Sequence, residues 1–330
     1  MKNRLRQFFR LAAHFQLMPV LESGDDPLIG GQAVIEGVMM RTPHSYCISV
    51  RRPNGEIIQQ EGVSHRLSET SRFWKLPVLR GLGTLGQAMS LGIKALKFSA
   101  DNAIEEGGEQ AGKQKRQEIP GWLMALNLAF SLGFFIFLYK FVPLALASQI
   151  QQQVSWMNGQ FSFSLVDGLI RLAIFLTFLT LISRMRDIRR VFEYHGAEHK
   201  VVFNYESGQP VTVAEAQKFV TFHPRCGTSF LMVVMLVSIL TYALVPFAGF
   251  AAQFAARIVL LPLIAGVSYE VIRFAARRQG SLFASLVAPG LWLQRITTKN
   301  PADEQVEVSI HSLRRAMELE QKQDGQLVIA

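Results

Sequence analysis

Residues 122–147 read WLMALNLAFSLGFFIFLYKFVPLALA, and this stretch decides the fold class of the chain. A helix needs about 20 predominantly apolar residues to cross the hydrocarbon core of a bilayer, and this run is longer than that. Trp122 opens the run, and Tyr139 and Lys140 lie toward its far end, where interfacial residues are typical. The stretch therefore predicts a transmembrane helix.

Three further apolar blocks occupy residues 165–182, 229–250 and 255–274. The first of them holds Arg171, whose long side chain can reach the nearer interface, with Asp167 one helical turn before it. Three residues interrupt the last block: Arg257, Pro262 and Glu270. Together the four blocks predict an α-helical membrane protein with about four transmembrane helices.

The composition of the 330 residues agrees with that class. Hydrophobic residues make up 49% and charged residues 18%, whereas soluble domains carry about 25% charged residues. The net charge of +9 excludes an acidic disordered tail protein. Two cysteines, Cys47 and Cys226, are too few for a disulfide framework, so we expect free thiols. Residues 1–28 form a basic N-terminal segment without the features of a signal peptide.

The distribution of Lys and Arg predicts the orientation. Residues 183–228 carry seven of them, and Arg273, Arg277 and Arg278 lie at the end of the fourth block, whereas the loop after the first block has none. Cytoplasmic loops carry such an excess, so both termini and the middle loop should be cytoplasmic. Anionic lipids then account for the positive charge, and the partner predicted is the lipid bilayer and not a nucleic acid.

The polar portions predict a small cytoplasmic α+β portion at residues 29–100. Two alternating runs flank Pro53, Asn54 and Gly55, which is a β-hairpin signal. Apolar residues then recur at spacings of three and four over residues 78–96, so this helix either lies in the membrane interface or covers the small sheet. We divide the remainder into a polar linker at 101–118, a membrane domain at 119–300, and a cytoplasmic tail at 301–330 with a solvated helix.

The middle loop contains HGAEH, in which His195, Glu198 and His199 have the spacing H-x-x-E-H. Residues four apart share a helix face, so both imidazoles could bind one metal ion, with Glu198 as general base. His223 and Cys226 follow at the spacing H-x-x-C in the same loop. These nitrogen and sulfur donors suit zinc.

Three other carboxylates are candidates for a role. Glu206 could be a further metal ligand or could orient one. Glu270 is a functional candidate because ionisable groups in a span are costly, and the alternative is an ion pair with Arg273 or Arg277. Glu36 lies among glycines in GGQAVIEGVMMR, where it could be a ligand, an anchor for an arginine or a turn residue.

Several of these motifs resemble the YqhQ-like family of bacterial membrane proteins. The matching segments are GGQAVIEGVMMR at 30–41, HGAEHK at 195–200, HPRCGTSF at 223–230, GVSYE at 266–270 and PGLWLQRITT at 289–298. The resemblance implies a multi-span protein of the bacterial inner membrane and a suggested metal dependence, without a settled reaction. The metal residues that it suggests fall on His195, Glu198, His199, His223 and Cys226.

The leading hypothesis is a divalent metal site, with zinc as the metal, that supports hydrolysis with Glu198 as the base. If four protein ligands close the site, the metal is structural instead. The main alternative is a non-enzymatic membrane accessory or assembly factor that binds a membrane protein partner or forms a homo-oligomer. A transporter that uses Glu270 and Arg171 is a third possibility, which the absence of an evident inverted repeat disfavours.

Overall fold

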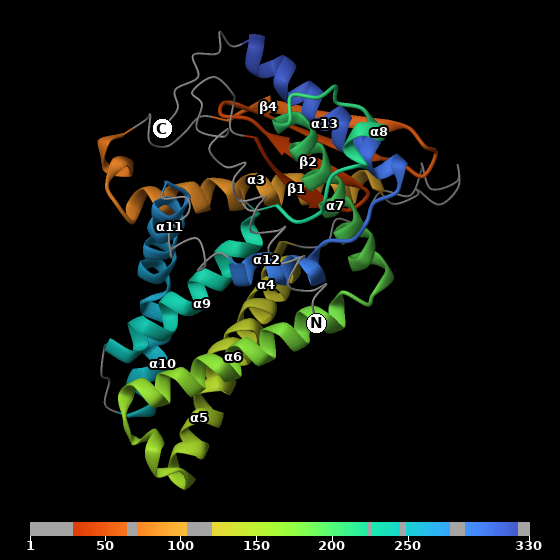
Figure 1. The fold of residues 1–330 in the computed structure, drawn as a ribbon. Helices are drawn as coiled ribbons and strands as arrows, with labels where there is room; N and C mark the ends of the chain where they lie inside the picture. The colour runs from red at the N-terminus through yellow and green to blue at the C-terminus, as the bar shows by residue number, and fades with distance from the viewer. Residues whose placement is uncertain are drawn as a thin grey trace, which may run out of the picture. The chain divides into compact units, whose positions relative to one another are not determined.

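The computed structural model describes residues 29–64, 71–103, 121–223, 226–244, 249–277 and 288–322. The predictions for residues 1–28 and for most of the linker at 101–118 therefore lie outside the described residues. The chain forms two compact units (Figure 1). The sheet unit contains residues 1–104, 183–233 and 268–330, and the apolar unit contains residues 105–182 and 234–267.

The sheet unit is built on a four-stranded antiparallel sheet in the order β1-β2-β3-β4. Its strands are β1 (Gly30–Val34), β2 (Gly37–Arg41), β3 (Ser45–Arg51) and β4 (Ile57–Val63). The predicted hairpin is β3–β4, which pairs Arg51 with Ile57 across the Pro-Asn-Gly turn. A second hairpin, β1–β2, turns at Ile35 and Glu36, and Glu36 adopts a positive φ of 53°.

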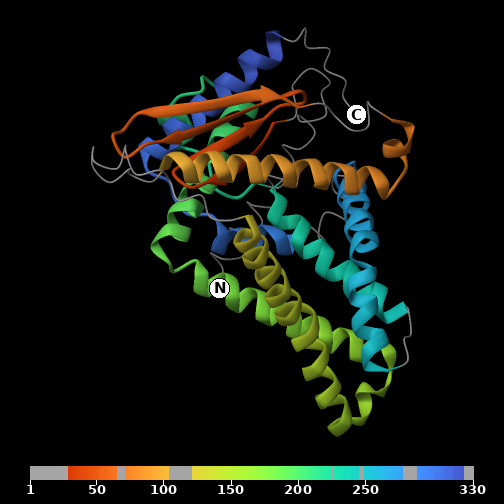
Figure 2. The same ribbon diagram turned by 180° about the vertical axis from the view of Figure 1, so that it is seen from behind.

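One face of the sheet is covered by α3 (Leu79–Ala103), as Figure 2 shows. Small residues of α3 face the sheet, among them Gly92, Ala95 and Ser99, and Ala95 packs in a core with Val34, Met39, Tyr46, Ile48 and Val50. The helix thus covers the sheet, but not through the predicted apolar stripe. That stripe points away from the sheet, with Met89 67% and Ile93 62% exposed.

The opposite face is covered by α7 (Arg186–Glu206) and α13 (Asp303–Lys322). The core there contains Val38, Met40 and Cys47 of the sheet, Tyr194, Ala197, Val201 and Val202 of α7, and Val306, Val308, Ile310, Leu313 and Ala316 of α13. The prediction of a solvated helix in the tail is therefore wrong. Most of its charged residues are exposed, whereas Glu320 is buried, and Ser312 joins the sheet by donating to Cys47 O and accepting from Met40 N.

The rest of the sheet unit consists of short elements and helix ends: a 3-10 turn at Arg72–Lys75, α8 (Val213–Ala216), α12 (Ala288–Thr297), the first turns of α9 (Gly227–Leu244) and the last turns of α11 (Leu261–Arg277). Glycine allows α12 to approach α9 closely, because a Cβ at Gly290 would lie 2.5 Å from Ser229 Oγ. This contact brings the PGLWLQRITT segment against the residues that follow Cys226.

The described residues of the apolar unit form helices joined by short breaks: α4 (Gly121–Ile136), a π-helical turn at Phe137–Phe141, α5 (Val142–Gln153), a 3-10 turn at Ser155–Asn158, α6 (Gln160–Ile182), the end of α9, α10 (Phe250–Val259) and the start of α11. Leu144, Ala147, Met157 and Phe163 form its core. Arg171 was expected to reach an interface, but it is buried beside Asp167.

Among the described residues, three helices are long and apolar enough to cross a membrane: Ala129–Gln153, Gln160–Ile182 and Gly227–Leu244. A fourth span is possible if Phe250–Val259 and Leu261–Phe274, bent by 51°, act together. The mostly helical fold with three or four apolar spans and a small sheet is thus confirmed. The first span continues beyond its apolar block to Gln153, and the second begins before its block, at Gln160.

Candidate metal centre

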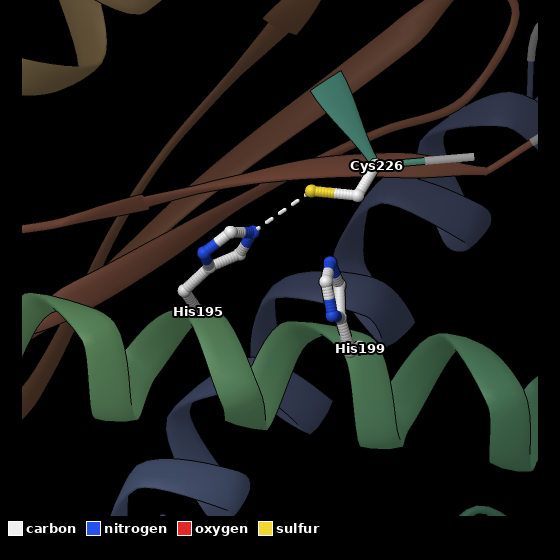
Figure 3. A group of neighbouring side chains, drawn as sticks. All are labelled: His195, His199 and Cys226. Atoms are coloured by element: carbon white, nitrogen blue, oxygen red, sulfur yellow. Dashed lines mark hydrogen bonds between the residues drawn. The ribbon is translucent and has the colours of Figure 1, made fainter. Parts of the chain in front are cut away.

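The candidate centre is built on α7, which carries the HGAEH motif in the middle of an unbroken helix. His195 and His199 lie one helical turn apart and point to the same side, toward Cys226 (Figure 3). Gly196 does not interrupt the helix, although glycine is a poor helix former. A Cβ at this position would clash with the carbonyl of Lys299, whose carbon lies 3.1 Å away, so the glycine lets residues 297–299 approach the helix.

The three side chains have the geometry of a ligand set. His195 Nε2 lies 3.2 Å from Cys226 Sγ, and the two imidazole rings are 4.5 Å apart between centroids. One ligand atom from each residue lies within 4.8 Å of the others. In a tetrahedral zinc site, Zn–N is about 2.0 Å and Zn–S about 2.3 Å, so N and S are about 3.6 Å apart. The His195–Cys226 distance is within a few tenths of an ångström of this value, and the donor set of two imidazoles and a thiol suits zinc.

Backbone carbonyls fix the tautomer of both histidines. His195 Nδ1 lies 2.8 Å from Thr297 O, and His199 Nδ1 lies 2.5 Å from Thr221 O. Because a carbonyl oxygen only accepts, each Nδ1 carries the proton, and each Nε2 keeps its lone pair. Metal-binding histidines usually have such a partner on the second ring nitrogen. The arrangement prepares both Nε2 atoms to bind a cation.

Metal binding requires a neutral imidazole, and burial favours the neutral form of His199 and of His223. Burial lowers the pKa of His199, and it lowers the pKa of His223 to about 4. His223 is not part of the ligand set, however. Its ring packs at a tilt of 57° against the ring of Phe203, with centroids 4.5 Å apart, and its Nε2 lies 3.4 Å from Glu206 Oε2. The structure thus places His223 and Glu206 together as a neighbouring pair.

Glu198 lies beside the ligand set. Its Oε2 is 3.4 Å from His199 Nε2, and the side chain is nearly buried. Strand β1 covers it, since a Cβ at Gly31 would lie 2.7 Å from Glu198 Oε1. The glycine-rich segment before β2 therefore has a role in the centre, as a backbone surface that leaves room for this carboxylate.

Two side chains that the sequence analysis did not select hold the loop that contains His223 and Cys226. Gln294 of α12 accepts from His223 N at 2.7 Å and donates to His223 O at 2.8 Å. Lys200 Nζ donates to Gln217 O and Phe219 O, and burial lowers its pKa. Lys200 is adjacent to the motif and Gln294 lies in PGLWLQRITT, but only the three-dimensional structure shows these contacts.

The two remaining candidates have structural partners outside the ligand set. Glu36 binds the guanidinium of Arg190 and accepts from Tyr194 OH at 3.3 Å, so it is both an arginine anchor and a turn residue. The hydrogen bond to Glu36 raises the pKa of Arg190. Glu270 binds Arg80 Nε at 2.7 Å and accepts from Val78 N, so its hydrogen-bonded ion-pair partner is Arg80 on α3 and not the predicted Arg273.

Comparison with known proteins identifies the family. Residues 76–319 match the family described as "Protein of unknown function (DUF1385)". The chain belongs to this family. It is also 34% identical to "Uncharacterized protein YqhQ" of Bacillus subtilis (strain 168) over 300 residues, which cover 89% of this chain and 93% of the relative. No solved structure matches the chain. The family match includes the three candidate ligands and Glu198, and the resemblance to YqhQ-like proteins is confirmed.

Proposed function

We propose that this DUF1385 protein is a metal-dependent hydrolase in which His195, His199 and Cys226 bind a zinc ion. The observation that carries the proposal is a pair of imidazoles, buried His199 and partly buried His195, whose Nδ1 atoms face backbone carbonyls and whose other side faces a thiol. Structural histidines have no need of this combination, whereas metal ligands commonly show it.

Among the described residues three ligands come together, and this number favours a catalytic over a structural metal. Catalytic zinc sites keep three protein ligands and an open position, and structural sites close with four. The fourth predicted donor, His223, lies against Glu206 and Phe203. A zinc ion held by His195, His199 and Cys226 would supply Lewis-acid chemistry, lowering the pKa of water to about 7 and polarising the bond to be cleaved.

The chain supplies the base for such a reaction. Glu198 takes a proton from the attacking water as its oxygen adds to the substrate carbonyl or phosphoryl group. When the intermediate collapses, the same carboxyl group returns the proton to the leaving group. Strand β1 covers Glu198 at Gly31 and excludes bulk water from this carboxylate. Thr221 and Thr297 hold the two imidazoles in place throughout.

We further propose that the protein lies in the bacterial inner membrane with both termini and the metal centre on the cytoplasmic side. The helices long enough to span support the membrane, and the excess of Lys and Arg at residues 183–228 supports the orientation. Reporter fusions at the C-terminus and at the turn near Asn158 should report opposite sides of the membrane.

The test of the reaction separates metal binding from chemistry. Untagged protein in detergent is assayed with p-nitrophenyl acetate and bis(p-nitrophenyl) phosphate, and its zinc is measured. Glu198→Gln should retain the zinc and lose about 10²–10⁴-fold in rate, the usual contribution of a general base. Glu215→Gln is the matched control, because this glutamate pairs with Lys218 away from the centre. An unchanged rate in zinc-loaded Glu198→Gln would exclude the proposed role.

A second function is supported by α3. Its exposed Met89 and Ile93 form an apolar stripe that suits a partner helix of a membrane accessory or assembly factor. In that case the metal would only stabilise the sheet unit. Zinc-loaded protein that hydrolyses neither probe, together with a stoichiometric partner captured by wild type but not by Ile93→Glu, would favour this function.

A further inference from the structure

The apolar unit contains a cluster of buried charges. Residues 121–182 and 234–267 include four charged residues in all: Lys140, Asp167, Arg171 and Arg257. Each is almost fully buried, with exposed fractions of 7%, 1%, 5% and 3%. They come from three different helical segments, yet they lie together, since Asp167 pairs with both arginines and the turn that carries Lys140 contacts both α6 and α10. Ionisable residues in apolar spans are costly and usually functional.

One carboxylate serves both guanidinium groups. Asp167 Oδ2 accepts from Arg171 Nη2 at 2.5 Å and lies 3.2 Å from Arg257 Nη2. Arg171 also donates to Ser238 Oγ at 3.0 Å, and both guanidinium groups lie over the ring of Tyr242, at 5.5 Å and 5.0 Å from its centroid. The ring contributes no formal charge, so the arginines retain an excess of one positive charge.

Lys140 adds a third cation. It lies in the π-helical turn Phe137–Phe141, and among the described residues it has no hydrogen-bond or ion-pair partner. The Nε atoms of Arg171 and Arg257 are also buried without an acceptor. The cluster therefore has three cations against one carboxylate, an excess of 3 − 1 = +2, and three donor groups to spare.

We propose that this cluster is a binding site for a phosphoryl anion. A phosphate monoester carries about −1.5 to −2 charges at pH 7 and three strong acceptor oxygens, which match the excess charge and the spare donors. Arginine is especially suited to phosphate because its planar fork matches the oxygens. Asp167 Oδ1, which also lacks a partner, can accept from a hydroxyl of the ligand.

The backbone around the cluster is irregular, as is common at binding sites within membranes. The π-helical turn presents Lys140, and α10 ends two residues after Arg257, where the helix pair bends by 51°. Arg171 is at the centre of the span Gln160–Ile182, and Lys140 is close to the centre of Ala129–Gln153. The phosphoryl group can come from inorganic phosphate or from a lipid headgroup.

The test uses full-length protein in neutral detergent and measures thermal unfolding at constant ionic strength. The probes are inorganic phosphate, dihexanoyl phosphatidic acid and, as zwitterionic control, dihexanoyl phosphatidylcholine. A rise in unfolding temperature with phosphate identifies a free anion, and a rise with phosphatidic acid alone identifies a lipid headgroup. No stabilisation by either phosphoryl probe overturns the proposal.

Two variants assign the binding to the cluster. Lys140→Met should lower the affinity for the bound probe by at least tenfold. The variant should fold, because the lysine has no hydrogen-bond or ion-pair partner to lose among the described residues. Lys97→Met, an exposed position on α3, is the matched control and should bind like wild type. Arg257→Gln should also weaken binding. Wild-type affinity in either cluster variant would overturn the proposal and would place the phosphate elsewhere, for example at the metal centre.

Discussion

Replacing Gly196 with alanine should weaken metal binding without changing any ligand. The new Cβ would lie well inside contact distance of Lys299 O, 3.1 Å from Lys299 C and 3.2 Å from Thr221 Cγ2. Carbon and oxygen atoms normally stay about 3.3 Å apart even in close contacts, so residues 297–299 must move away from α7. That movement breaks the hydrogen bond between His195 Nδ1 and Thr297 O.

The expected magnitude follows from three contributions. Overpacking costs about 1–3 kcal/mol, and the lost hydrogen bond about 0.5–1.5 kcal/mol. The higher helix propensity of alanine offsets about 1 kcal/mol. The net loss in the free energy of unfolding is therefore about 0.5–3.5 kcal/mol. Because the affected carbonyl orients a ligand, zinc affinity should fall about 10–100-fold.

The assay is zinc competition with a fluorescent chelator, together with thermal unfolding of the metal-free protein. Gly86→Ala is the matched control, because Gly86 lies in helix α3 and nothing is within 4 Å of its added Cβ. This control should be stabilised by about 0.5–1 kcal/mol and should bind zinc like wild type. Wild-type zinc affinity and increased stability in Gly196→Ala would refute the reasoning.

Three further predictions follow from other contacts. Zinc should protect Cys226 from iodoacetamide. Cys47 should stay unreactive with or without zinc, because it is buried and burial raises its pKa to about 11. Equal labelling of Cys226 in the presence and absence of zinc would contradict this prediction. Gln294→Met leaves two backbone groups of His223 unpaired, so it should lower stability by about 2–4 kcal/mol and weaken zinc binding. Wild-type stability and zinc affinity in this variant would contradict the role given to the two hydrogen bonds of Gln294. Burial opposes ionisation of Glu320, but hydrogen bonds from Thr42 and His44 outweigh it and hold the pKa of this carboxyl below 4.5. Glu320→Gln should therefore destabilise the protein at pH 7, and the difference in stability from wild type should disappear as the pH falls below about 4.5. A constant difference in stability from pH 7 to pH 4 would exclude this contribution.

Local patterns predicted the elements well. The Pro53-Asn54-Gly55 turn marked the β3–β4 hairpin, and the spacing of His195 and His199 placed both on one helix face. These features depend on residues close in sequence, where turn chemistry and helical periodicity decide the geometry. The same holds for the apolar spans, since length and hydropathy alone define them.

Long-range partners were not predictable in this way. Glu270 was expected to pair with a nearby arginine, but it pairs with Arg80, far away in sequence. The tail helix looked solvated because its mean hydropathy is low, yet one face of it packs on the sheet. The carbonyls of Thr221 and Thr297 have no sequence signature at all, since every residue has a carbonyl group.

The central claim is that His195, His199 and Cys226 form a zinc site with one open position. Elemental analysis and X-ray absorption of untagged, detergent-purified protein test it most directly. The test variants are His199→Ala and Cys226→Ser, and their matched controls are His311→Ala and Cys47→Ser. The account predicts about one zinc per chain in wild type and both controls, loss of zinc in His199→Ala, and a spectrum with one sulfur at about 2.3 Å and nitrogen or oxygen ligands at about 2.0 Å. Protein without zinc after reconstitution, or zinc retained with an unchanged spectrum in Cys226→Ser, would contradict it.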